Sequence, residues 1–102
     1  MGRILITGTN SFVGAGITNK AFSTNDIVVG GQNNIANGPQ AVVVGGNNNG
    51  ATGPQSFIGG GSSNKANLTG DVVVGGLSNT ATGPQAVVVG GILNKANGAN
   101  IF

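Results

Sequence analysis

The chain has no cysteine, histidine, tryptophan or tyrosine, and only six of its 102 side chains are charged. Without cysteine there are no disulfides and no thiolate ligands for a metal ion. Without histidine, and with only two carboxylates, the usual general acids and bases are nearly absent. We therefore expect no enzyme activity, no cofactor and no metal site.

The formal net charge of +2 rests on so few ionised groups that it does not indicate nucleic-acid binding. No apolar run approaches the roughly 18 residues that cross a bilayer, so we expect no membrane insertion by this segment. The N-terminus also lacks the long apolar stretch of a signal peptide. If the parent protein is secreted, we expect this chain to be an excised piece of it.

Glycine is abundant, with 21 residues, and the chain is built on a repeat of fifteen residues. The unit is clearest in residues 41–55, and six copies fill residues 11–100 without insertion or deletion. Fixed spacing of this kind is typical of a solenoid, in which each unit forms one coil that stacks on the next. We number the places in a unit from one to fifteen, and the units begin at Ser11, Asp26, Ala41, Ser56, Asp71 and Ala86.

Three places are the same in all six copies. Place six is glycine, place nine is asparagine and place eleven is alanine, and we interpret all three as structural. Stacked asparagine side chains are expected to bond to the turn backbone or to the amides above and below. The columns are Gly16, Gly31, Gly46, Gly61, Gly76 and Gly91; Asn19, Asn34, Asn49, Asn64, Asn79 and Asn94; and Ala21, Ala36, Ala51, Ala66, Ala81 and Ala96.

Each unit contains the signals of two short strands and two turns. Places two to four are an apolar run, as in residues 42–44, which predicts a first strand covered on both faces. A Gly-Gly pair at places five and six permits a sharp turn. Places eight to twelve predict a second strand, in which nine and eleven point to one side and ten and twelve point to water. Gly-Pro-Gln, as in residues 38–40, closes the unit with a second turn. The predicted fold class is all-β, a parallel β-solenoid of six coils.

The segment before the repeats, residues 1–10, is expected to be a capping strand centred on residues 4–6, and residues 101–102 are the C-terminal end. Residues 4–14 also resemble the strand and glycine loop of nucleotide-sugar epimerases of the extended short-chain dehydrogenase family. However, Ser11 stands where the middle glycine of that loop belongs, and no helical pattern follows. We therefore do not expect NAD binding.

The apolar first strand predicts an oligomer. One face of this strand packs inside its own coil, and the other face needs a cover that identical strands of neighbouring chains supply. Three chains around an axis make a natural closed arrangement of parallel rods. We therefore expect a homotrimer.

The repeats resemble those of a known family. Residues 86–98, and equally residues 71–83, are similar to the head repeats of trimeric autotransporter adhesins (YadA-like heads), and very similar repeats occur in phage and large-virus fibre proteins. Asn replaces the family's Ser at place nine, and Val replaces its small Ala at place three. The resemblance implies a left-handed trimeric β-roll at an extracellular, cell or virion surface. It implies the head or shaft of an adhesin or fibre that attaches to a host receptor, glycan or matrix protein.

The charged side chains fall in two columns. Lys20, Lys65 and Lys95 all occupy place ten, on one exposed line. This line either provides solubility and protects the sheet, or it binds an anionic ligand such as a sulfated glycan or lipopolysaccharide. Asp26 and Asp71 both occupy place one, three coils or about 14 Å apart, which is too far for a catalytic pair. We interpret them as polar residues at a turn.

Two other classes of function are alternatives to attachment. The Gly, Asn, Ala and Gln spacing of residues 46–55 resembles the repeats of curli-type functional amyloid, so polymerisation into fibres is the alternative function. Val44 and Val89 stand where that pattern has an earlier Gln. Ice binding needs a regular threonine ladder, whereas the threonines Thr18, Thr24, Thr52 and Thr80 fall in different columns.

Places two and four vary together. Phe12 is accompanied by Gly14 and Phe57 by Gly59, whereas Val or Ile at place two is accompanied by Val at place four. Residues two apart share a face of a strand. We therefore interpret the pair as one packed volume that is filled in two ways.

Overall fold

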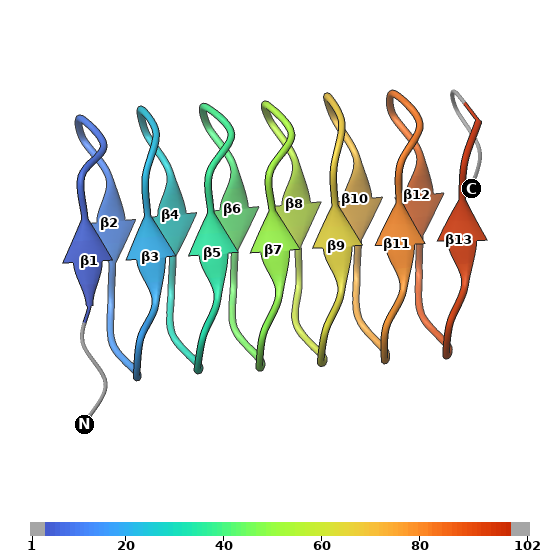
Figure 1. Cartoon of the computed structure of the whole chain (residues 1–102), viewed down its shortest axis with the longest axis horizontal. Coiled ribbons are helices and arrows are strands. Elements are labelled where there is room, and N and C mark those ends of the chain that lie inside the picture. Colours follow the sequence, from blue (N-terminus) through green and yellow to red (C-terminus); the bar gives the residue numbers. More distant parts are fainter. Residues whose placement is uncertain (1–3, 99–102) are drawn as a thin grey trace.

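The computed structural model of the chain describes residues 4–98, which form one parallel β-solenoid with no helix in that range. Each full coil contributes one two-residue strand to each of two sheets, and the coils follow one another along a straight rod (Figure 1). The solenoid predicted from the repeat is confirmed. Residues 1–3 of the predicted cap, residues 99–100 of the last unit and the C-terminal end at 101–102 lie outside the described residues.

The two sheets face each other across the coil. Sheet A has seven strands and begins with the predicted capping strand, β1, which pairs with β3. Its members are β1 (Leu5–Ile6), β3 (Lys20–Ala21), β5 (Ile35–Ala36), β7 (Gly50–Ala51), β9 (Lys65–Ala66), β11 (Thr80–Ala81) and β13 (Lys95–Ala96). Sheet B has six strands, β2 (Phe12–Val13), β4 (Ile27–Val28), β6 (Val42–Val43), β8 (Phe57–Ile58), β10 (Val72–Val73) and β12 (Val87–Val88).

The register between neighbouring strands equals the length of the repeat. Val72 lies opposite Val87 in sheet B, and Thr80 lies opposite Lys95 in sheet A. A third ladder of single bridges joins the residues at place seven, from Ile17 to Ile92. Because all coils are equally long, each place in the unit forms a straight column along the rod. The rod measures 35 × 24 × 13 Å, and its broad faces are the outer faces of the two sheets.

The second strand is shorter than predicted. It occupies places ten and eleven rather than eight to twelve, because the residue at place eight has a left-handed backbone in every coil, with φ of 58° at Thr18 and 64° at Asn48. This conformation cannot continue an extended strand. Asn adopts it more readily than most residues, and Asn33 and Asn48 at place eight are the signal that the prediction missed.

The core is one thin layer between the sheets. Place three of sheet B faces inward, and Val28, Val43 and Val73 are fully buried. Place eleven of sheet A supplies the alanines opposite them, of which Ala36 and Ala51 are fully buried. One valine (in the fourth coil, Ile58) and one alanine fill this narrow space between the strands of each coil, so a larger residue at place eleven would overpack it.

Only one glycine of each Gly-Gly pair is required by the turn. Gly46, at place six, has φ of 89°, and a Cβ there would lie 2.2 Å from Gly61 O and 2.6 Å from Asn49 Nδ2. Gly45, at place five, would meet nothing within 4 Å, and Ala15 occupies that place in the first coil. The invariant glycine therefore leaves room for the invariant asparagine and for the backbone of the next coil.

Candidate functional site

The asparagine column joins successive coils from inside the rod. Asn49 Oδ1 accepts the N–H of Asn64 at 2.9 Å in the next coil. Its Nδ2 donates to Gly45 O at 2.9 Å in its own coil and to Gly61 O at 3.1 Å in the next. The predicted bonds to the turn backbone are present, whereas the hydrogen bonds of the described column contain none from one side-chain amide to another. The first five asparagines are at most 1% exposed, so this column holds the fold and is closed to ligands.

The two aspartates are fully buried turn residues. Asp71 Oδ2 accepts the N–H of Leu68 at 3.0 Å, and its Oδ1 accepts the N–H of Ala86 at 2.9 Å in the next coil. Asp26 makes the matching bonds to the preceding turn and the following coil, at 2.7 and 3.0 Å. Each carboxylate therefore satisfies two backbone donors and closes a turn, which is not a catalytic arrangement.

Aspartate appears at place one only where the preceding turn lacks Gly-Pro-Gln. Asp26 follows Ser-Thr-Asn and Asp71 follows Leu-Thr-Gly, whereas Ala41, Ser56 and Ala86 each follow Gly-Pro-Gln. The sequence prediction placed the aspartates at turns but missed their burial, and this alternation was the available signal. Burial raises the pKa of the Asp26 carboxyl above its ordinary value of 3.8, although its two backbone N–H bonds act in the opposite direction.

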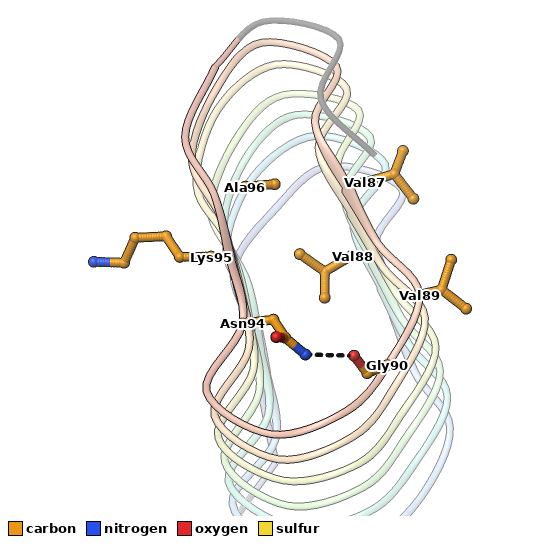
Figure 2. Close-up of a pocket in the computed structure, with 7 residues that line it drawn as sticks. All are labelled: Val87, Val88, Val89, Gly90, Asn94, Lys95 and Ala96. Atoms are coloured by element: carbon orange, nitrogen blue, oxygen red, sulfur yellow. Dashed lines mark hydrogen bonds between the residues drawn. The ribbon is translucent and has the colours of Figure 1, made fainter.

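The outer face of sheet B is apolar in every coil. Places two and four point away from the core, as Figure 2 shows for Val87 and Val89 on either side of the inward-pointing Val88. The side chain of Val44 is 40% exposed and that of Val74 is 48% exposed. The first strand is thus covered on one face by its own coil, and within the described chain its other face is open.

Phe12 and Phe57 lie on this same face, beside the glycines at place four. A Cβ at Gly14 would lie 3.0 Å from Phe12 Cε1, and a Cβ at Gly59 would lie 3.5 Å from Phe57 Cε1. Places two and four therefore share a face, as their covariation predicted. The backbone adds a second restriction, because the same Cβ at Gly59 would also lie 2.4 Å from Val74 O in the next coil.

The outer face of sheet A is polar and carries all three lysines of the described residues. Lys20, Lys65 and Lys95 stand at place ten of coils one, four and six, and Figure 2 shows Lys95 pointing away from the interior. Hydroxyl and amide side chains fill much of the rest of this face, for example Thr52 and Asn67, whose side chains are bonded at 3.2 Å. The two broad faces of the rod are therefore chemically different.

The last described coil ends in a cavity of about 370 Å³, which residues 87–90 and 94–96 line (Figure 2). Asn94 Nδ2 donates to Gly90 O at 2.8 Å, but among the described residues it has no second acceptor of the kind that Asn79 finds in Gly91 O. Asn94 is also exposed, unlike the five asparagines before it.

The structure also bears on the classes of function that the sequence disfavoured. Residues 4–14, which resemble a dinucleotide loop, fold as β1, a turn and β2, with no helix after them in the described range. Thr52 and Thr80 lie at different places of sheet A and form no continuous threonine ladder. Residues 4–98 contain no cluster of three metal-ligating side chains and no helix that would span a membrane.

Comparisons with known proteins find no match for this chain among family models, curated proteins or solved structures. The solenoid and the chemistry of its two broad faces are therefore the features from which a function can be inferred.

Proposed function

We propose that this chain is a structural and adhesive module, a segment of the head or shaft of a trimeric surface adhesin or of a viral or phage fibre, which attaches to a host or receptor surface. The observation that carries the proposal is the apolar outer face of sheet B, which continues through all six coils. The left-handed coil and the extracellular location that the family resemblance implies are part of the same proposal.

The size of the apolar face supports association with other copies. Monomeric soluble proteins rarely expose a continuous apolar strip of this kind. The broad face of the rod measures 35 by 24 Å, which is close to the roughly 800 Å² that each partner buries in a stable interface. Parallel rods with the same coil spacing bring equivalent residues to the same height, and three rods around an axis leave no such face open.

Light scattering coupled to size exclusion tests the assembly. A homotrimer has three times the mass of the 9.8 kDa chain. Val44→Lys together with Val74→Lys places charges on the outer face of sheet B and should abolish the trimer. The matched control is Thr52→Lys with Thr82→Lys, which adds the same charges to the outer face of sheet A and should leave the mass unchanged.

Far-UV circular dichroism on the same samples shows whether the variants are folded. If the valine-to-lysine variant unfolds, Val44→Thr with Val74→Thr keeps the side-chain shape and should make the trimer dissociate on dilution. A stable wild-type monomer at micromolar concentration would contradict the proposal. So would a trimer that persists in folded variants of both kinds on sheet B.

A second candidate function is polymerisation into curli-like fibres, and the constant register between coils favours it. Each place pairs with the same place fifteen residues on in both sheets, and the asparagine column links successive coils through repeated amide bonds. Coils of another copy can add to such a stack through the same fifteen-residue register. This function predicts fibres that lengthen with time and bind thioflavin, whereas a closed trimer predicts a constant mass.

A further inference from the structure

The exposed charge of the described chain has only one sign. Both aspartates are fully buried and bonded to backbone N–H groups. No ion pair occurs among residues 4–98, and the ionised side chains that reach water there are Lys20, Lys65 and Lys95. The described surface therefore offers ammonium groups and no carboxylate to a ligand.

The three lysines lie on one line parallel to the rod. They share place ten of sheet A, so the ladder of that sheet keeps them in one column. Lys20 and Lys65 are three coils apart and Lys65 and Lys95 are two, which corresponds to about 14 Å and about 10 Å at the spacing of paired strands. A ligand that contacts all three must be an extended polymer with several negative charges that lies along the rod.

The surface between the lysines indicates the type of polymer. Beside the lysine column, place twelve presents hydroxyl and amide side chains, which bond to sugar hydroxyls, whereas Ile35 and Gly50 stand between Lys20 and Lys65 on the column itself. Single-stranded nucleic acid is usually held by aromatic stacking, and Phe22 is the one aromatic residue at places ten and twelve. Membrane surfaces require several bulky apolar side chains that insert, and within the described coils only Ile35 and Phe22 are of this kind at places ten and twelve. The polar residues of the face are Asn37, Thr52, Asn67, Thr80, Thr82 and Asn97.

We propose that the outer face of sheet A binds a linear anionic polysaccharide with sulfate or carboxylate groups, which lies along the lysine column. The inference rests on the proposed function, because packing of sheet B against other copies leaves sheet A as the outward face. Three chains then present three such columns, so that weak contacts add through avidity. Binding to a charged polymer should weaken steeply with salt, because its counterions are released on contact.

The test measures binding to immobilised heparin and to a matched uncharged dextran, as a function of NaCl concentration. Lys20→Gln, Lys65→Gln and Lys95→Gln together should reduce the affinity for heparin by at least about tenfold at low salt. The control adds Thr24→Lys, Asn47→Lys and Thr69→Lys to that triple variant, which restores the net charge at exposed positions that do not all share one column. This relocated-charge variant should bind as weakly as the triple variant.

Several outcomes overturn the inference. A relocated-charge variant that binds heparin as tightly as the wild type shows that only net charge matters. Absence of wild-type binding to heparin at low salt rejects the polysaccharide. Tighter binding to oligothymidine, or to phosphatidylserine vesicles, assigns the face to nucleic acid or membrane instead. Light scattering on the same samples measures the oligomeric state independently. A trimer that does not bind heparin rejects this inference alone, whereas a monomer rejects the proposed assembly.

Discussion

Asn64 provides the sharpest test of how the coils are held together. Its Oδ1 accepts the buried N–H of Asn79 at 2.9 Å, and its Nδ2 donates to Gly60 O at 2.9 Å and to Gly76 O at 3.0 Å. Asn64→Ala removes all three bonds. The unsatisfied N–H costs about 1–3 kcal/mol, and the two carbonyls, which are partly hydrated, add about 0.5–1 kcal/mol each. We therefore expect a loss of about 3–4 kcal/mol, which lowers Tm by about 15–25 °C in a domain of this size.

Asn94→Ala is the matched control at the end of the same column. It removes one bond, to Gly90 O, from an exposed side chain and should cost about 1 kcal/mol or less. Asn64→Asp keeps the volume but places a carboxylate against two carbonyl oxygens, so it should be at least as destabilising as Asn64→Ala. Urea unfolding at one protein concentration compares all three variants. Equal losses in Asn64→Ala and Asn94→Ala would refute the argument that bonds between coils stabilise the rod.

Four further predictions follow from the turns and from the outer face. Asp71→Ala should lower the free energy of unfolding by about 2 kcal/mol, because the N–H groups of Leu68 and Ala86 lose their acceptor. Replacing residues 68–71 with Gly-Pro-Gln-Ala should recover most of this loss, as measured by urea unfolding. No recovery would contradict the interpretation that Gly-Pro-Gln and the aspartate are two ways to close the same turn. Gly59→Val should cost more than the about 1–3 kcal/mol of side-chain overpacking, because its Cβ would also lie 2.4 Å from Val74 O. Adding Phe57→Val removes the ring but not this backbone contact, so it should recover only part of the loss. The shared packing of places two and four fails if the double variant melts no higher than the single one. Leu93→Asn should stabilise the fold by about 1 kcal/mol, because asparagine tolerates the φ of 58° better than leucine does. The opposite change at the same place of another coil, Asn33→Leu, should destabilise the fold by a similar amount, and calorimetry measures both variants. Because burial raises the pKa of Asp26 in the fold, its contribution to stability is full below pH 3.8 and is lost as pH rises through the folded value. The Tm of the wild type minus that of Asp26→Asn should therefore fall as pH rises above 3.8, and a difference that grows would contradict this.

The sequence alone was sufficient to predict the coil because its information is periodic. A strict repeat of fifteen residues puts equivalent residues above one another, so Val43 and Ala51 predict the core of every coil from one unit. The turn at Gly46 and the inward asparagine at Asn49 follow from residue type and place. The lysine column followed in the same way, since residues with the same place and the same strand must share a line. The trimer and its ligand remain predictions.

Only the tertiary structure decided what each place contacts across coils. It shows that Gly46 is required and Gly45 is not, because the obstacle to a side chain is Gly61 O, fifteen residues away. It shows that Asp71 is buried, because its carboxylate reaches a donor in its own turn and another at Ala86 in the next coil. It also begins the second strand at place ten and ends it at place eleven, where the local pattern gave no boundary. Periodicity tells which residues share a column. Contacts between neighbouring coils depend on where the backbone of the next coil lies, and the sequence of one unit does not specify that position.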